Sequence, residues 1–208
     1  MMQDRLLDVA IREFGLKGLD GASTRAIAAA ADTAMSSITY HYGSKDALYL
    51  AAADHIAAQM AEEMAPTLAL CDPAGSCDAA AARENIHRVM ALLAARMANA
   101  GNADRTLFIL REQMNPGEAF ERIYAGMMGT LVRHLSALIA IVTGCPAVDA
   151  RVATVTMVGQ VLAIRASHGS ILRLFDIESL DPIHADLIVQ RIHANVDAIL
   201  DRMANESE

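Results

Sequence analysis

Apolar residues recur along much of the chain at the spacing of an amphipathic helix. The first such stretch, from Asp4 to Phe14, places five of them on one face, at Leu6, Leu7, Ala10, Ile11 and Phe14. Lys17-Gly18 follows as a C-terminal stop, and Ser23, Thr24 and Ser44 stand where helix caps are expected. Glycines and prolines divide the remainder, and the pattern predicts further helices over residues 25–31, 35–42, 44–66, 79–99, 103–114, 118–142, 149–174 and 182–203.

Composition supports an all-α fold. Alanine, the strongest helix former, occupies 41 of the 208 positions. Aromatic residues make up 4% of the chain and tryptophan is absent, which argues against a β-sandwich or barrel. The N-terminus has no basic and apolar leader, and the charge-free stretch 135–148 is interrupted by Gly144 and Pro146. We therefore expect a soluble, cytoplasmic protein without a membrane span.

Two of the expected helices, 25–31 and 35–42, are short and joined by a tight turn, as in a helix-turn-helix. Ile27, Ala28, Ala31 and Ile38 suit the face on which the two helices pack. The outer face of the second helix carries hydroxyl groups and an imidazole that can meet base edges and phosphates, from Ser36, Ser37, Thr39, Tyr40 and His41.

Residues 23–48, read as STRAIAAAADTAMSSITYHYGSKDAL, resemble the DNA-binding domain of TetR-family transcriptional regulators. The resemblance implies a three-helix helix-turn-helix domain over residues 1–50, joined to a larger helical ligand-binding and dimerisation domain over 51–208. The family usually has Gly in the turn where this chain has Asp32, which tolerates a left-handed backbone. It often has Tyr where this chain has Thr39. The DNA-contacting residues implied are Thr24, Arg25, Met35, Ser36, Ser37, Thr39, Tyr40, His41 and Lys45.

The charge of this region is unusual for a DNA-binding protein. The whole chain has a net charge of −8, and residues 1–55 hold five basic against seven acidic side chains. Such a chain does not coat nucleic acid by bulk charge, but a local reading module remains possible. DNA affinity would then rest on dimerisation and on neutral hydroxyl and backbone contacts. The alternative is a helical small-molecule-binding protein without DNA-binding function.

The C-terminal part carries its own resemblance. Residues 111–116 (REQMNP) and 159–165 (GQVLAIR) are similar to segments of the C-terminal domain of the CecR type, also called CerR. Small residues at Gly159, Ala163, Ala166 and Ser170 form a stripe that permits a close helix–helix approach. The last helix has a long apolar face, formed by Ile183, Leu187, Ile188, Ile192, Val196, Ile199, Leu200 and Met203. We expect a homodimer through a four-helix bundle, and the alternative is that both faces are buried within one protomer.

Methionines and aromatic residues collect between these regions. Flexible thioethers suit an adaptable apolar pocket, although for any one methionine ordinary core packing is the favoured explanation, and it is the group that indicates a ligand. We expect an apolar or amphipathic effector, oriented by a few polar side chains. Glu112, Arg165 and His168 are further polar candidates. The residues expected to line the effector site are Met90, Met97, Phe108, Arg111, Met114, Phe120, Tyr124, Met127 and Gln160.

The sequence offers no motif for catalysis or cofactor binding. The chain has no phosphate loop, dinucleotide-binding glycine motif, nucleophile elbow or zinc-protease motif, so we expect neither an enzyme nor a cofactor. Cys71 and Cys77 bracket an expected loop, where two free thiols are favoured over a metal or redox pair. Cys145 fits a small buried position. The sequence thus predicts an effector-responsive DNA-binding regulator, and we expect a repressor.

Overall fold

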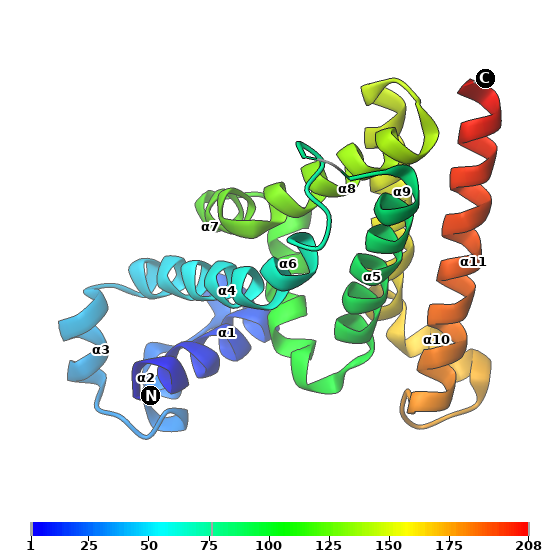
Figure 1. Ribbon diagram of the computed structural model, residues 1–208. Coiled ribbons are helices and arrows are strands. Elements are labelled where there is room, and N and C mark those ends of the chain that lie inside the picture. Colours follow the sequence, from blue (N-terminus) through cyan, green and yellow to red (C-terminus); the bar gives the residue numbers. More distant parts are fainter. Residues whose placement is uncertain (1, 76, 208) are drawn as a thin grey trace. The chain divides into compact units, whose positions relative to one another are not determined.

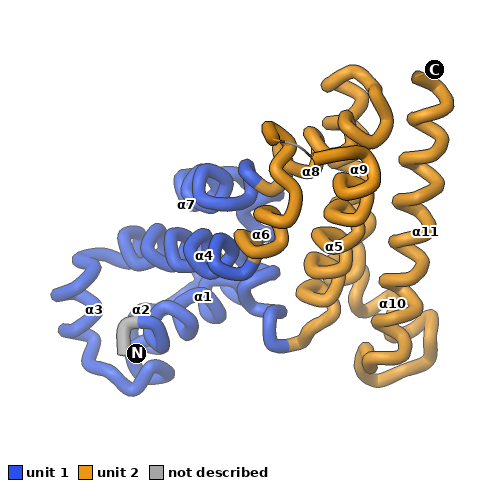
Figure 2. Tube along the Cα trace, viewed as in Figure 1, with its two compact units in different colours: residues 1–63, 101–130 blue, residues 64–100, 131–208 orange. Residues whose placement is uncertain are grey.

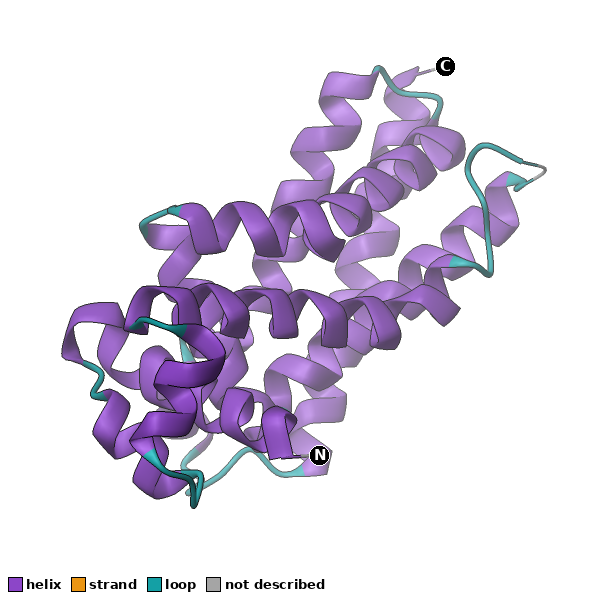
Figure 3. Ribbon diagram, turned by 90° about the vertical axis from the view of Figure 1, so that its left-hand side faces the viewer, coloured by secondary structure: helices purple, strands orange, loops and turns teal. Residues whose placement is uncertain are grey.

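The computed structural model describes residues 2–75 and 77–207, and this part of the chain contains helices and no strand (Figures 1 and 3). The all-α prediction is confirmed. The helices in chain order are α1 (Met2–Gly21), α2 (Thr24–Ala30), α3 (Met35–Tyr42), α4 (Lys45–Leu68), α5 (Ala79–Ala98), η1 (Ala100–Asn102), α6 (Ala103–Met114), α7 (Glu118–Ile123), η2 (Tyr124–Met128), α8 (Gly129–Thr143), α9 (Ala147–Ala166), α10 (His168–Phe175) and α11 (Pro182–Ser207).

The chain forms two compact units (Figure 2). Unit 1 contains residues 1–63 and 101–130, and unit 2 contains residues 64–100 and 131–208. The predicted boundary near residue 50 lies inside α4, which is continuous there. Helix α6 therefore belongs to the same compact unit as the helix-turn-helix segment. The division into functional domains at residues 1–50 and 51–208 remains a prediction.

An aromatic cluster fills the core of unit 1. Tyr49 of α4 packs edge-on against Phe14 of α1, with ring centroids 4.9 Å apart, and stacks on Phe108 of α6 at 4.7 Å. Gly15 allows this close approach, because a Cβ atom there would lie 2.7 Å from the carbonyl oxygen of Asp104. Burial of such rings is the main contribution that holds α1, α4 and α6 together.

The stop predicted at Lys17-Gly18 is confirmed, because α1 consists of two helical segments that meet at a kink there, and the second segment reaches Gly21. Gly18 adopts φ 73° and ψ 174°, a backbone conformation available to glycine. The kink interrupts the helical hydrogen bonds, and the guanidinium of Arg111 donates to the carbonyl oxygens of Gly15 and Leu16 at 3.4 Å each. The stop signal at Gly18 thus produces a bend held by α6.

Three helix predictions need correction. The predicted helix 118–142 is divided by the π-helical turn η2, where Gly126 faces α4. A Cβ atom on Gly126 would lie 2.6 Å from Cβ of Ala57, so the residue permits a contact that periodicity does not reveal. The predicted helix 149–174 is broken at Ser167 into α9 and α10. Pro66 falls inside α4, two residues before its end.

Unit 2 packs α5 against α9 and α11. The side chains of Ile192, Val196 and Leu200 on α11 are buried. At the edge of this contact, Asp197 accepts from Arg83 at 2.8 Å and lies 2.9 Å from Nε2 of His87. This part of the apolar face of α11 is therefore buried within one protomer, as the alternative to a dimer interface anticipated.

A buried polar chain joins three elements of unit 2. The amide nitrogen of Asn85 donates to the carbonyl of Thr67 at 2.7 Å, so its oxygen is left to accept from Nε2 of His134 at 2.9 Å. Burial lowers the pKa of His134. The neutral ring, with its proton on Nε2, is the form that fits this arrangement.

The loop between α4 and α5 contains a disulfide between Cys71 and Cys77, whose Cα atoms are 5.5 Å apart. The expectation that favoured two free thiols is therefore wrong. Hydrogen bonds to Asp72 from the amides of Ala74 and Gly75, each 3.0 Å long, fold the intervening turn. Cys145 is a free, buried cysteine, as expected. Within the described residues, no group of histidine, cysteine and carboxylate side chains is arranged to hold a metal ion.

Two helical segments of the described chain meet the length and composition of a membrane span, although the sequence analysis expected none. They are Glu118–Thr143 and Ala147–Ala166, each with 33% of its apolar window buried. Core helices of globular proteins meet the same criterion. The second segment contains Asp149, Arg151 and Arg165.

Candidate nucleic-acid interface

Helices α2 and α3 form the predicted helix-turn-helix within unit 1. Ile27, Ala28, Ala31 and Ile38 are buried, which confirms the predicted packing face. Asp32 adopts φ 55° in the connecting turn. The prediction that an aspartate can occupy this left-handed position is therefore confirmed, and the amide of the next residue donates to the carbonyl of Ala28.

Helix α3 presents the predicted reading surface to solvent. Tyr40 is 85% exposed, and Met35, Ser36, Thr39 and His41 are also exposed, while Ser37 is half-buried. The Thr39 hydroxyl donates to the carbonyl of Met35 at 3.2 Å, so its oxygen lone pairs remain able to accept. Most of the surface of α3 other than the buried side at Ile38 is thus accessible, with a mixture of donors, acceptors and apolar groups.

The helix starts on either side of α3 supply backbone groups and cations. Ser23 occupies the N-cap position of α2 but makes no side-chain capping bond there, contrary to expectation. Ser44 does cap α4, since its hydroxyl accepts from the amide of Ala47 at 3.0 Å. Thr24 is half-buried and Arg25 is exposed at the first turn of α2. Their contacts with phosphate remain a prediction.

Lys45 has a role that sequence reasoning missed. Its ammonium donates to the carbonyl oxygens of Asp20 at 3.3 Å and Ala22 at 3.5 Å, where α1 leads into α2. A lysine has three N–H donors, so one remains for a phosphate. The same side chain can therefore fix the entry to α2 and contact DNA.

Most other cations of this region are already engaged. Arg12 lies 3.8 Å from Asp104, and Lys17 lies 2.6 Å from Glu13. Arg25 makes no ion pair within the described part of the chain. The cationic contribution to DNA binding should therefore be small and concentrated at Arg25 and Lys45.

The residues predicted to line an effector site are distributed between the two units. Met90, Met97 and Gln160 lie in unit 2, and the other six lie in unit 1. Phe108 and Met90 are fully buried and Met114 is 79% exposed, whereas Phe120 and Tyr124 stack with their ring centroids 5.7 Å apart. A cavity of about 460 Å³ in unit 1 is lined by Arg111 and by none of the other eight. The effector-site residues stay a prediction.

Comparison with known proteins decides the family. The model of the bacterial regulatory proteins of the tetR family matches residues 6–52, and that of the C-terminal domain of the HTH-type transcriptional dual regulator CecR matches residues 82–203. The HTH-type transcriptional dual regulator CecR of Shigella flexneri is 33% identical over 98% of this chain and 93% of its own length. The chain belongs to the TetR family of bacterial transcriptional regulators.

Solved structures show the same fold for this TetR-family regulator. A TetR-like regulator from Rhodococcus sp. RHA1 has a TM-score of 0.67 and 19% identity, with 96% of each chain covered. AibR, solved in complex with isovaleryl coenzyme A and operator DNA, has a TM-score of 0.71 and 16% identity over 94% of this chain and 98% of its own. These structures show that the regulator has a known fold, and its membership of the TetR family makes it a DNA-binding transcriptional regulator.

Glu112 connects three helices of unit 1 in a way the sequence did not reveal. One carboxylate oxygen accepts from the Tyr49 hydroxyl at 2.5 Å, and the other accepts from the amide of Phe120 at 3.0 Å. The second bond caps the first turn of α7, whose N-cap residue Gly117 has no side chain to do so. Burial and the bond to Glu112 raise the pKa of Tyr49. The phenol therefore remains a donor at physiological pH.

Proposed function

We propose that the regulator is a homodimeric, effector-responsive repressor that acts in the cytoplasm. The observation that carries the DNA-binding part is the exposed α3 face, positioned by a buried α2–α3 contact. A dimer would place two such helices about 34 Å apart, one turn of B-DNA. The effector would favour a second spacing and so reduce operator affinity, which requires different affinities for the two states.

The free face of α9 supports the dimer. Gly159, Ala163 and Ala166 of α9 are all exposed in the single chain, as is Ser170, which the break at Ser167 places on α10. Nothing lies within 4 Å of a Cβ atom placed on Gly159. The same face of α9 continues through exposed valines at Val148, Val152 and Val155. A contiguous apolar face with a small-residue stripe is the surface that a second copy can approach closely.

An apolar or amphipathic effector is supported by the side chains around α6, α7 and η2. Phe120 and Tyr124 form a partly exposed aromatic pair, and Met114 is exposed nearby in sequence. AibR, the structural neighbour, binds an amphipathic acyl thioester together with its operator. We infer that the effector of this regulator is of similar general character and contacts this region.

The effector is tested with small molecules that remain bound to the protein during purification. Molecules released from purified protein by unfolding are identified by mass spectrometry and added to refolded protein bound to a fluorescent operator duplex. We expect one of them to weaken operator binding by tenfold or more, about 1.4 kcal/mol. A molecule that binds tightly but leaves operator affinity unchanged would contradict effector-dependent release.

The reading surface is tested by substitution on α3. Thr39→Ala and Tyr40→Ala should change the preferred base at particular operator positions, because base-edge contacts carry the sequence information. Equal losses on every duplex would contradict a base-reading role for these two residues. Failure of wild-type protein to bind any duplex would favour the helical small-molecule-binding protein as the alternative.

A further inference from the structure

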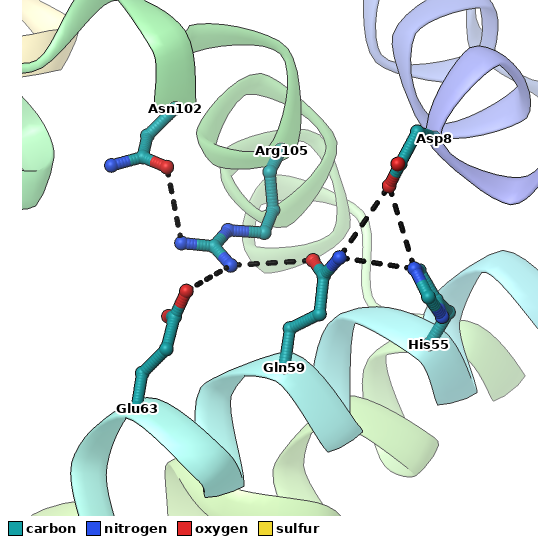
Figure 4. A network of polar contacts seen from close by, with 6 residues as sticks. All are labelled: Asp8, His55, Gln59, Glu63, Asn102 and Arg105. Atoms are coloured by element: carbon teal, nitrogen blue, oxygen red, sulfur yellow. Dashed lines mark hydrogen bonds and ion pairs between the residues drawn. The ribbon is translucent and has the colours of Figure 1, made fainter. Parts of the chain in front are cut away.

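A partly buried polar network connects three helices of unit 1 (Figure 4). Arg105 of α6, whose side chain is 13% exposed, donates to Glu63 at 3.1 Å and to Oε1 of Gln59 at 3.3 Å, both on α4. Its other terminal nitrogen donates to Asn102 at 3.3 Å. The amide nitrogen of Gln59 lies 3.0 Å from Nε2 of His55. The network is thus continuous from α6 along α4 to His55.

The network reaches α1 through Asp8. One oxygen of this carboxylate lies 3.4 Å from Nε2 of His55 and 3.4 Å from the amide nitrogen of Gln59. Asp8 is exposed, whereas the His55 side chain is only 16% exposed. The imidazole therefore sits at the junction of α1 and α4, largely out of solvent.

Donor and acceptor rules fix the protonation of the ring in this arrangement. A guanidinium can only donate, so Gln59 must turn its oxygen toward Arg105. Its amide nitrogen, which can also only donate, then faces His55. Nε2 of His55 must therefore accept, and the ring must be neutral with its proton on Nδ1.

A second proton on His55 is incompatible with these bonds. Two N–H groups would then face each other across the 3.0 Å between Gln59 and His55. Gln59 cannot turn its oxygen to the ring without turning N–H groups toward Arg105. The acceptor that remains for a protonated ring is Asp8, at 3.4 Å. The protonated state thus exchanges a hydrogen bond within α4 for an ion pair between α4 and α1.

The charges around the ring act in both directions. Asp8 and Asp4 face it from α1, and both favour the protonated form. Arg105 faces the network from α6 and opposes an additional positive charge, while Glu63 on the same helix as His55 partly neutralises Arg105. Histidine is the side chain whose ordinary titration falls within the physiological range. The site therefore offers two arrangements, one with the neutral ring bonded to Gln59 and one with the protonated ring paired with Asp8.

We propose that His55 is a proton-sensitive joint between α1 and α4, so that acidification rearranges the helix on which α2 and α3 pack. Ile11 and Phe14 of α1 share a core with Ile27 and Ile38, so a displacement of α1 reaches the helix-turn-helix directly. Operator affinity then depends on pH through His55. The consequence for DNA rests on the proposed operator binding, whereas the joint itself does not.

The joint is tested without DNA by following the imidazole of His55 through a pH titration by NMR. Gln59→Met removes the donor to the neutral ring and should move the titration of His55 to higher pH. Gln59→Glu keeps the side-chain shape, supplies an acceptor, and should move it further in the same direction. Asp8→Asn should move it to lower pH. The titration of exposed His41 should be unchanged in all three variants.

Conformational coupling is read from the backbone amides of α1. In the wild type, amides of residues 6–14 should shift with the same midpoint as the His55 ring, and this response should vanish in His55→Gln, which cannot take the proton. Two results would contradict the proposal. One is an unchanged titration midpoint of His55 in the Gln59 variants, and the other is α1 amide shifts whose midpoint differs from that of the His55 ring.

The effect on DNA is measured with a selected operator duplex in a His41→Gln background, because His41 lies on α3 and can itself titrate against phosphate. Operator affinity should change by about threefold or more between pH 7.5 and 5.5, and His55→Gln should abolish this change. An unchanged pH dependence in His55→Gln would refute the effect on DNA. Absence of any duplex binding by the wild type contradicts the proposed function instead, while the NMR titration still decides the joint.

Discussion

Removal of the Tyr49 hydroxyl tests the internal organisation of unit 1. In Tyr49→Phe the ring still packs between Phe14 and Phe108, but the carboxylate of Glu112 loses the donor that lies 2.5 Å away. Glu112 is only 7% exposed, so loss of the hydroxyl removes a partner from a largely buried carboxylate. The amide of Phe120 remains as its partner.

The expected cost follows from that geometry. A hydrogen bond to a charged group contributes roughly 1.5–3 kcal/mol to stability, and loss of one partner leaves a buried acceptor underused. For a chain of this size, 1 kcal/mol corresponds to a shift in Tm of about 2–4 °C. We therefore expect Tyr49→Phe to lower Tm by about 3–12 °C.

The assay is thermal and chemical unfolding at a single protein concentration, because the stability of a dimer depends on concentration. Tyr40→Phe is the matched control. It removes the same atom from a tyrosine of the same unit that is 85% exposed, and should cost less than about 0.5 kcal/mol.

A double-mutant cycle with Glu112→Gln then isolates the pair. The coupling energy between the two positions should be about 1–3 kcal/mol. Tyr49→Phe leaves a buried carboxylate without its donor when Glu112 is present, and costs less stability when Gln is present at position 112. Equal stability of Tyr49→Phe and Tyr40→Phe, or a coupling near zero, would refute the reasoning about Glu112.

Three further predictions concern DNA binding, assembly and pH. Lys45→Ala should weaken binding to all duplexes and reduce the salt dependence by about one unit, measured by fluorescence anisotropy across a salt series; an unchanged slope contradicts a phosphate contact. Gly159→Arg should yield a monomer of unchanged helicity in sedimentation and circular dichroism, because its side chain meets only solvent in one protomer; a persistent dimer places the interface elsewhere. The pKa of His134 is lower in the folded chain than in the unfolded chain, so on acidification the unfolded chain takes up a proton at higher pH than the folded chain does. The free energy of unfolding should therefore fall as pH drops below about 6.5. His134→Gln should reduce that fall in denaturant titrations at pH 7.5 and 5.5, and an equal fall in both proteins contradicts this contribution.

Periodicity and turn chemistry predicted most of the helices because they depend on neighbours in sequence. The α2–α3 packing face and the left-handed position of Asp32 are local properties of this kind. Exposure of the α3 side chains also follows from the pattern. Ile38 of α3 shares a core with Ile27 of α2, so the polar side chains on the other sides of α3 are left facing solvent.

The remaining features depend on partners distant in sequence. Gly15 and Gly126 are explained only by the backbone of α6 and by Ala57 on α4, which approach them in the folded chain. Arg111 and Glu112 carry charges that suggested a ligand, yet in the structure they bind α1 carbonyls, a tyrosine and the first turn of α7. A sequence shows that such groups are present but does not show which buried partners satisfy them.

The central claim is that two copies of this chain read one operator through α3. The most direct measurement is selection of binding duplexes from a random library at low and moderate salt, with protein refolded free of bound small molecules. The account predicts enrichment of a palindrome whose half-sites lie about one helical turn apart. Failure to enrich any sequence at either salt concentration would contradict it.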